Sequence, residues 1–360
     1  MFKVEPVTSA LGTNSAPPDW RPDRLLDRYE TLTIALADDP DHEDPITATL
    51  VRKAGPEPAR NGAVLYVHGF TDYFFHEPLA EHFHAHGYAF YALDLRKCGR
   101  SLAGHHTPHF TTDLRAYDEE LGAALDMVVA ETGGPVLVVA HSTGGLIAPL
   151  WLDRLRATDP HRHAHVCGLV LNSPWFDLQG HPVLRTPIVS AIIRAAAALC
   201  PRRVIPRRLS DGYGRSIHES GNGEWSYELS LKPLGGFPVT FGFLGAVRRG
   251  HARLHRGIDV GVPSLVLRSD KTYFDPIRRG TVDNADVVVD VRHIARWCGC
   301  LGNRISCVPI PDARHDVFLS VEAAREQAYR EVTAWLRATS PMTTDRDGAE
   351  RATTDEGALA

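Results

Sequence analysis

The sequence predicts an α/β fold, in which a mostly parallel central sheet is flanked by helices. Short apolar runs typical of buried strands alternate with segments of helical periodicity along most of the chain. One such run, residues 136–140, continues through a turn of small residues directly into a helical pattern. At 360 residues, the chain is long enough for one large domain that carries an inserted subdomain.

The predicted strands and helices follow one another in a regular order. Residues 29–37 and 46–52 alternate polar and apolar positions, as strands near a sheet edge do. Buried strands are predicted at residues 63–67, 88–95, 136–140, 166–172, 263–269 and 304–309. Helices are predicted at residues 77–86, from Thr111 or Thr112 to Gly133, from Thr143 onward, and after Ser320 as a cap. Strands that alternate with helices form βαβ units and therefore a parallel sheet.

Three segments lie outside this core, which comprises residues 28–175 and 262–340. Residues 1–27 are polar and rich in proline, and we expect an N-terminal extension there. Residues 341–360 have too few apolar side chains to offset the entropy of ordering, so a disordered tail is predicted. Residues 176–261 lack the alternation of strands and helices, and they are predicted to form a cap, or lid, over the top edge of the sheet.

The predicted cap contains two apolar pieces. Residues 188–199 form a helix-like apolar run that Arg194 interrupts. We therefore expect this helix to pack on the core, and contact with a membrane surface is the alternative. Residues 237–243 add aromatic side chains, and both pieces are predicted to line an apolar channel, because so much apolar surface must be buried against something.

Composition limits the functions that the chain can have. The formal net charge of -5 gives no electrostatic reason to expect binding to nucleic acid. The six cysteines form no disulfide-like pattern, which indicates reduced thiols and a cytoplasmic protein. We expect neither a signal peptide nor a transmembrane segment, because no apolar run has the required length. The histidines lack the H-E-x-x-H pattern, so neither a metal site nor a cofactor is predicted.

The turn after residues 136–140 places a serine between a buried strand and a helix. Its sequence, A-H-S-T-G at residues 140–144, is a variant of the nucleophile-elbow pattern G-x-S-x-G, with Ala140 in place of the first glycine. Only small residues fit two positions before and after the serine, and Ala140 meets that demand. The alternative is an ordinary turn in which Ser142 caps the following helix.

Four further motifs accompany the serine pattern. All five are V-L-Y-V-H-G-F-T (64–71), L-D-L-R-K-C-G-R-S (93–101), V-V-A-H-S-T-G-G (138–145), L-N-S-P-W-F (171–176) and R-H-D-V-F-L-S (314–320). With them the chain resembles the α/β-hydrolase superfamily, and within it the branch of monoacylglycerol lipases, lysophospholipases and serine-aminopeptidase-like hydrolases. The departures are Ala140 and an unusual insertion before the predicted catalytic acid.

The resemblance implies a serine esterase. Ser142 would be the nucleophile that forms an acyl-enzyme, and His315 would be the base that activates it. The backbone N–H groups of Phe70 and Thr143 would form the oxyanion hole, and His68 is expected to support that loop. The implied substrate is a small-molecule carboxylic ester, most simply a lipid-like one such as a lysophospholipid or a monoacylglycerol.

Two aspartates compete for the role of triad acid. Asp270 directly follows the predicted strand 263–269, where this fold normally places its acid. The residues after it resemble an inserted loop, however, and Asp286 lies in a stretch that resembles the acid motif of the family. The predicted elements between Asp286 and His315 also have the spacing that the family shows. The resemblance therefore favours Asp286, and Asp270 remains the alternative.

Two other classes of function remain open from the sequence. An acyltransferase would use the same triad with an alcohol acceptor in place of water. A non-catalytic binding protein of this fold would keep the cap but lose Ser142 or His315, and both are present. Epoxide or haloalkane hydrolysis is disfavoured, because those relatives place a carboxylate at the position of Ser142.

Overall fold

The computed structural model describes residues 18–55, 59–206, 210–274 and 282–339. The predicted disordered tail, residues 341–360, lies outside the described residues, as do residues 1–17 of the predicted N-terminal extension. Residues 21 and 22 of that extension form the first strand of the sheet and pair with residues 30 and 31. The ordered core therefore starts several residues before the predicted boundary at residue 28.

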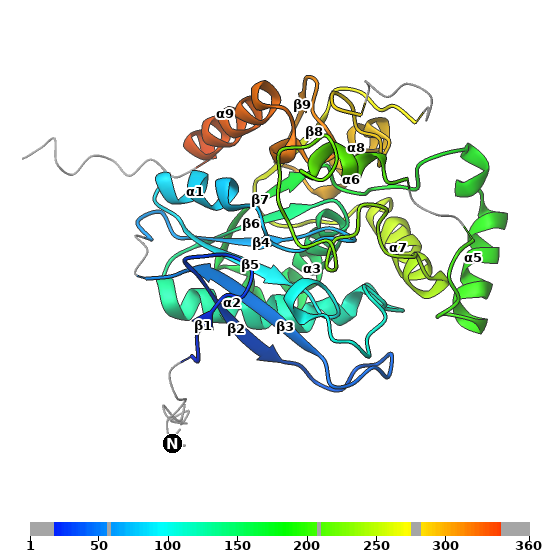
Figure 1. The fold of residues 1–360 in the computed structure, drawn as a ribbon, viewed down its shortest axis with the longest axis horizontal. Helices are drawn as coiled ribbons and strands as arrows, with labels where there is room; N and C mark the ends of the chain where they lie inside the picture. Colours follow the sequence, from blue (N-terminus) through cyan, green and yellow to red (C-terminus); the bar gives the residue numbers. More distant parts are fainter. Residues whose placement is uncertain (1–17, 56–58, 207–209, 275–281, 340–360) are drawn as a thin grey trace, which may run out of the picture.

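Within the described residues, nine strands form one sheet in the order β1-β2-β3-β5-β4-β6-β7-β8-β9 (Figure 1). The strands are β1 (Arg21–Pro22), β2 (Tyr29–Ala35), β3 (Thr47–Lys53), β4 (Ala63–Val67), β5 (Ala89–Asp94), β6 (Val136–His141), β7 (Val166–Asn172), β8 (Ser264–Ser269) and β9 (Ile305–Ile310). Strands β1 to β3 are antiparallel, and the sheet is parallel from β5 to β9. This confirms the predicted α/β fold with its mostly parallel sheet.

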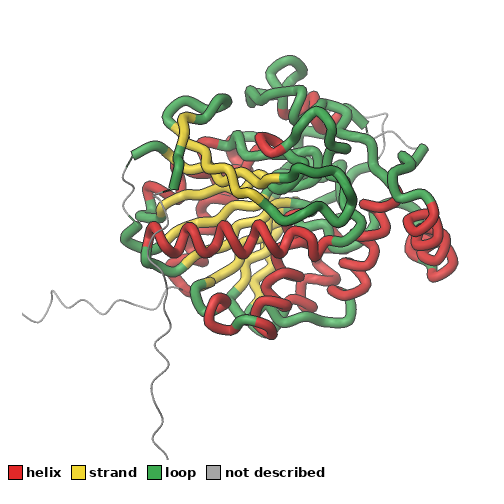
Figure 2. The backbone as a smooth tube through the Cα atoms, turned by 90° about the horizontal axis from the view of Figure 1, so that it is seen from below, coloured by secondary structure: helices red, strands yellow, loops and turns green. Residues whose placement is uncertain are grey.

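Helices cover both faces of the sheet. They are α1 (Glu77–Ala85), α2 (Asp118–Thr132), α3 (Gly144–Thr158), α4 (Pro160–His163), α5 (Pro187–Leu199), α6 (Gly212–Ile217), α7 (Phe241–Leu254), α8 (Val291–Trp297) and α9 (Glu322–Thr339). Short 3₁₀ helices lie at Gly99–Ser101, Leu114–Tyr117, Pro182–Arg185, Cys298–Leu301 and Val317–Leu319. Figure 1 shows α1 and α9 on one face and α2 on the other, and Figure 2 shows helices crossing the strands.

The alternation of side chains along β4 divides the core into two layers. Val64 and Tyr66 belong to the cluster that includes residues of α1 and α9, whereas Leu65 and Val67 pack in the cluster with α2 and α3. Successive side chains of a strand point to opposite faces, so a strand covered by helices on both sides is apolar throughout. All five residues of β4 are accordingly buried.

Two predicted helix starts differ from the structure. The helical segment before β6 begins with Asp113, whose carboxylate accepts a hydrogen bond from the N–H of Arg115. Thr112 instead donates its hydroxyl to Asp41. Ser320 donates to the carbonyl of Asp316 and does not cap the last helix. Each hydroxyl finds a partner distant in sequence or within its own turn, which local propensity does not reveal.

The chain leaves the sheet after β7 and returns at β8. The described residues of this insertion form α5, α6 and α7 and contribute no strand to the sheet. Helix α7 packs against α3 of the core and against α5, which lies at the margin of the molecule in both views (Figure 1, Figure 2).

The expectation that residues 188–199 pack on the core is wrong for most of this helix. Ile193 is buried, but Ile188 is 73%, Ile192 61% and Leu199 86% exposed. The reason is that α5 meets α7 through small residues: a Cβ added to Gly245 would lie 2.6 Å from the Cβ of Ala197. The large aliphatic side chains Ile188, Ile192 and Leu199 are therefore left exposed.

Candidate active site

Ser142 occupies a strained turn between β6 and α3. Its φ is 50°, in the left-handed region that residues other than glycine rarely adopt. Its N–H donates to the carbonyl of Asn172 over 3.0 Å, and its own carbonyl accepts from the N–H of Trp175 over 2.9 Å. These two bonds hold the strained residue at the carboxyl edge of the sheet, beside the end of β7.

The residues around this turn are small because the backbone is crowded. Ala140 is fully buried between the neighbouring strands. A Cβ added to Gly144 would lie 2.4 Å from the carbonyl oxygen of His68, and one added to Gly145 would lie 2.7 Å from the Cβ of Pro174. Both distances are shorter than real contacts allow, so the two glycines are required by close packing.

The structure brings Ser142, His315 and Asp286 together. The Oγ of Ser142 lies 2.9 Å from the Nε2 of His315, and the Nδ1 of His315 lies 2.9 Å from the Oδ2 of Asp286. All three side chains are buried. With the carboxylate accepting the Nδ1–H, the imidazole is held in the tautomer whose Nε2 accepts the serine hydroxyl proton.

Asp286 is fixed by its own neighbours. Its Oδ1 accepts hydrogen bonds of 2.8 Å from the N–H groups of both Val288 and Val289. The carboxylate therefore has both oxygens engaged, one on the backbone and one on His315.

Asp270 lies elsewhere and is exposed. Its carboxylate accepts from the N–H of Asp312 over 3.1 Å. The chain after β8 explains how the later aspartate reaches the histidine: Thr272 and Asp286 form a β-bridge, in which the N–H of Asp286 donates to the carbonyl of Lys271 over 3.0 Å. The inserted stretch thus leaves and returns at one narrow neck, which brings Asp286 back to the end of β8.

The backbone N–H groups of Phe70 and Thr143 both lie next to the serine. Thr143 is the N-cap residue of α3, and a Cβ added to Gly69 would lie 3.0 Å from the Cβ of Ser142. Within the described part of the chain, neither N–H donates to a recorded acceptor. Two donors at a helix N-terminus and an adjoining loop can stabilise a developing oxyanion.

His68 and His109 support the loop that carries Phe70. The Nε2 of His68 accepts from the N–H of Leu95 over 3.1 Å, so its Nδ1–H donates to the carbonyl of Gly69 over 2.7 Å. The ring of Phe70 lies between His109 and Phe243, with centroid distances of 4.8 Å to each. Burial lowers the pKa of His109 to about 3, so this histidine is a neutral support.

Comparison with known proteins identifies the family. The sequence profile of the family described as "Serine aminopeptidase, S33" matches residues 58–270. The chain belongs to this family. The match includes Ser142 and the Phe70 loop, whereas Asp286 and His315 lie beyond it and are related to Ser142 by geometry.

Solved structures show the same fold at low sequence identity. A soluble variant of monoglyceride lipase from Saccharomyces cerevisiae, in complex with a substrate analog, has a TM-score of 0.59 and 16% identity, covering 94% of this chain and 100% of that one. Monoacylglycerol lipase from Paleococcus ferrophilus has a TM-score of 0.55 and 19% identity, covering 82% and 99%. A lipase in its open form has a TM-score of 0.56 and 16% identity, covering 86% and 99%. No curated protein sequence matches the chain.

These findings confirm the predicted resemblance to the α/β-hydrolase superfamily. Membership of the serine aminopeptidase family makes the chain a hydrolase of the α/β-hydrolase type. At these identities the solved structures establish the fold alone.

In this S33 family member, a second cluster of polar side chains lies next to His315. The sequence analysis did not predict this cluster. Asn172 donates to the Oδ1 of Asp316 over 2.6 Å, and the Nε2 of His141 lies 3.8 Å from the Oδ2 of Asp316. The ring of His141 is 4.9 Å from that of His315. Burial opposes ionisation of Asp316, but His141, His76 and the bond from Asn172 outweigh it and lower the pKa of Asp316. The R-H-D motif places Asp316 next to His315 in the sequence, and this adjacency could have indicated the cluster.

Tyr213, which comes from the insertion, also contacts the histidine. Its ring stands nearly perpendicular to that of His315, with centroids 5.7 Å apart, and its hydroxyl accepts from the N–H of Asp316 over 3.3 Å. No sequence pattern marked this residue, because the contact joins α6 to a loop about a hundred residues later.

The structure does not point to a metal at this site. Among the described residues, no group of three or more histidine, cysteine, aspartate or glutamate side chains is arranged to hold a metal ion. Nor does the described part of the chain contain a helix whose length and apolar character would let it cross a membrane.

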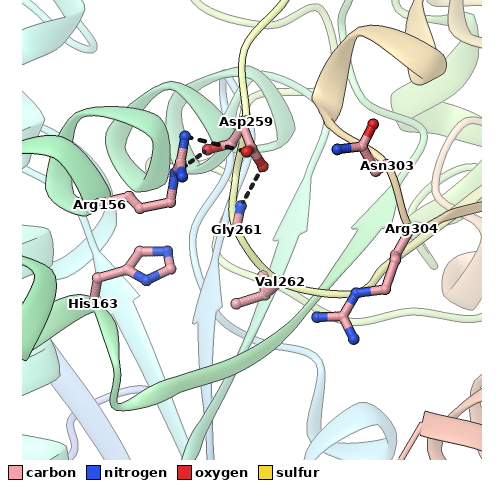
Figure 3. A pocket seen from close by; sticks show the side chains of 7 residues that line it. All are labelled: Arg156, His163, Asp259, Gly261, Val262, Asn303 and Arg304. Atoms are coloured by element: carbon pink, nitrogen blue, oxygen red, sulfur yellow. Dashed lines mark hydrogen bonds and ion pairs between the residues drawn. The ribbon is translucent and has the colours of Figure 1, made fainter.

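A cavity of about 330 Å³ lies near the amino-terminal ends of strands β8 and β9 (Figure 3). It is lined by Arg156, His163, Asp259, Gly261, Val262, Asn303 and Arg304. Val262 and Arg304 come just before β8 and β9, whereas Ser142 follows the end of β6. Because these strands are parallel, the cavity lies at their amino-terminal ends and the candidate active site lies at their carboxyl-terminal ends.

Proposed function

We propose that this protein is a serine esterase that cleaves carboxylic esters through an acyl-enzyme on Ser142. The observation that carries the proposal is the hydrogen-bonded chain from Ser142 through His315 to Asp286. A serine hydroxyl is a weak nucleophile until an adjacent base removes its proton, and the base works only when a third group fixes its tautomer. The three side chains that would play these parts are buried, which supports the proposal.

In the first half of the reaction, the Oγ of Ser142 attacks the ester carbonyl while the Nε2 of His315 takes its proton. Asp286 stabilises the resulting imidazolium. The N–H groups of Phe70 and Thr143 stabilise the negative charge on the carbonyl oxygen. The imidazolium then gives its proton to the leaving alcohol, and the acyl group stays on Ser142. Water, activated by His315, releases the acid in the second half.

The substrate that we propose is a lipid-like acyl ester, such as a lysophospholipid or a monoacylglycerol. Two structures with the same fold are named as monoglyceride and monoacylglycerol lipases. Aromatic rings also gather around the Phe70 loop: the ring of Phe70 stacks on that of Phe243, and the ring centroids of Phe237 and His109 lie 5.8 Å apart. Such rings suit an acyl chain better than a charged peptide.

An ester series tests this assignment. With a constant alcohol, kcat/KM is expected to rise from acetyl towards medium-chain esters, by about fourfold for each methylene that is fully buried, because each contributes ~0.8 kcal/mol. Rates are measured below the concentration at which each ester forms micelles. A flat or falling profile would favour small polar esters over lipid-like ones.

We propose further that residues 176–261 act as a cap over the candidate active site. Two observations support this: Tyr213 packs on His315, and the N–H of Phe237 donates to the hydroxyl of Thr71 over 2.9 Å. Both contacts place the insertion beside the triad histidine and the Phe70 loop.

The exposed face of α5 supports transient contact of this cap with an anionic membrane surface. Among the described residues, the strongly exposed large apolar side chains are Val183, Ile188, Ile192, Leu199, Val204 and Phe274. All of them except Phe274 lie on or next to α5. Residues 178–210 also contain six arginines and no aspartate or glutamate. An apolar helix face with arginines in the flanking segments suits the interface of a bilayer with anionic lipids.

Vesicle sedimentation tests the membrane contact. Replacing Ile188 and Ile192 together by serine is expected to weaken binding to phosphatidylserine-containing vesicles at least about tenfold, because each buried isoleucine contributes roughly 1.5–3 kcal/mol. The matched control is Phe274→Ser, which removes an exposed apolar side chain away from α5 and should leave binding unchanged. Equal binding of the double variant and the wild type would contradict the proposal.

We also propose that the protein works in the cytoplasm. The support is that all six cysteines are free thiols, as expected in a reducing compartment.

A further inference from the structure

We propose that Lys232 is a positioning residue, which holds the loop of residues 69–73 in the geometry that its oxyanion donor requires. The proposal rests on the proposed esterase function, because that function gives the N–H of Phe70 its role. Lys232 belongs to the insertion, and it acts on the loop through the carboxylate of Asp72.

One carboxylate links the lysine to the loop beside the serine. The Nζ of Lys232 lies 2.5 Å from the Oδ1 of Asp72, while the Oδ2 of Asp72 accepts from the N–H of Gly69 over 3.4 Å. Both partners are buried, with 7% of Lys232 and 3% of Asp72 exposed. Gly69 directly precedes Phe70, and a Cβ added to it would lie 3.0 Å from the Cβ of Ser142.

The same stretch of the insertion makes two further contacts with this loop. The N–H of Glu228 donates to the hydroxyl of Tyr73 over 2.7 Å, and the N–H of Phe237 donates to that of Thr71. Thr71 has a φ of 53°, and a strained residue keeps such a conformation only when several contacts fix it. Lys232 lies between these two attachments in the sequence and supplies the charged one.

The charge of Lys232 matters as much as its contact. Burial opposes the ionisation of Asp72, but the charge of Lys232 is the largest influence that opposes burial, its hydrogen bond adds to this effect, and the pKa of Asp72 is lowered to about 2. The other recorded neighbours of the ammonium group are the rings of Phe75 and Tyr227. Without Lys232, a buried anion would stand beside the N–H groups that must stabilise a second anion. Ester binding is neutral and would not feel this repulsion, whereas the transition state would.

The test compares Lys232→Met with a double variant that also carries Asp72→Asn. Lys232→Met is expected to lower kcat by about 10- to 100-fold while KM stays within about twofold of the wild type, because a misplaced donor costs the transition state alone. The affinity for an aliphatic trifluoromethyl ketone, which forms a tetrahedral adduct with the serine, should fall by the same factor. The double variant should recover part of both losses, since it has no unpaired buried charge.

Arg253→Met is the matched control. It removes an ion pair of 2.7 Å between α7 of the insertion and Asp153 on α3, roughly 14 Å along that helix from Gly144. We expect Arg253→Met to keep the wild-type kcat and ketone affinity. All rates are divided by the number of serines that a fluorophosphonate labels at completion, so that a loss of folded protein does not count as a loss of kcat.

The outcomes are distinct. If the wild type is active and Lys232→Met lowers only the melting temperature, the positioning role is refuted and the esterase proposal stands. An equal loss of kcat in Arg253→Met would also refute the positioning role, because loosening the insertion at any point would then be enough to lower kcat. If the wild type hydrolyses no ester, the proposed function fails and this inference fails with it.

Discussion

Replacing Ser142 by alanine is expected to lower ester turnover by roughly 10⁴- to 10⁶-fold, since the members of a triad act as a unit. The substitution removes the hydroxyl that His315 would deprotonate and leaves the Cβ in place. Alanine and serine share the same backbone restrictions, so the positive φ of this turn adds no new strain. The melting temperature should therefore change little while kcat falls. Steady-state kinetics with a short-chain ester and a melting curve measure the two effects.

Ser173→Ala is the matched control for this experiment. Ser173 is also buried, has a φ of 44° and follows the end of the neighbouring strand β7. Its hydroxyl has no hydrogen-bond partner among the described residues. Turnover by Ser173→Ala should stay near that of the wild type. Substantial activity in Ser142→Ala would show that another group is the nucleophile.

Replacing Asp286 by asparagine is expected to lower turnover by up to ~10⁴-fold, by analogy with the effect of this change in a serine protease triad. Asparagine keeps the shape of the side chain, but its amide can donate to His315 where the carboxylate could only accept. The imidazole would then favour the tautomer that cannot take the proton of Ser142. The measurement is kcat as a function of pH. If His315 still acts as a weak base in the variant, activity should partly return at high pH.

Asp270→Asn is the paired control for the acid. Asp270 is exposed and bonds to the backbone of Asp312, so its replacement should cost less than about tenfold in turnover. The opposite ranking of the two variants would overturn the assignment of Asp286.

Much of this fold could be predicted from the sequence, because burial on both faces leaves a strong pattern. The strand that leads to Ser142 is apolar from Val136 to Ala140, and the small residues on either side of Ser142 mark the crowded turn. The motifs also marked Ser142, His315 and the Phe70 loop, which lie close together in the structure. These features depend on contacts that are local or that repeat with the period of a strand or helix.

The rest depends on contacts between distant segments. An apolar run such as Ile188 to Leu199 predicts a helix, but only its packing partner decides which side is buried, and here Gly245 faces its small residues. Lys232 and Tyr213 reach the site from the insertion without any motif. Spacing from the strand alone favoured Asp270, because the neck between Thr272 and Asp286 cannot be seen in a sequence.

Because of that neck, the position of Asp286 does not depend on the length of the segment between Thr272 and Asp286. Asp286 is anchored by backbone bonds to Lys271 and Tyr273 on one side and by its own bonds to Val288 and Val289 on the other. The entropic cost of closing a loop grows slowly with its length, by about 0.6 kcal/mol for each doubling. Insertions and deletions between the two arms of the neck can therefore accumulate over evolution at little thermodynamic cost, while the carboxylate keeps its register with the imidazole.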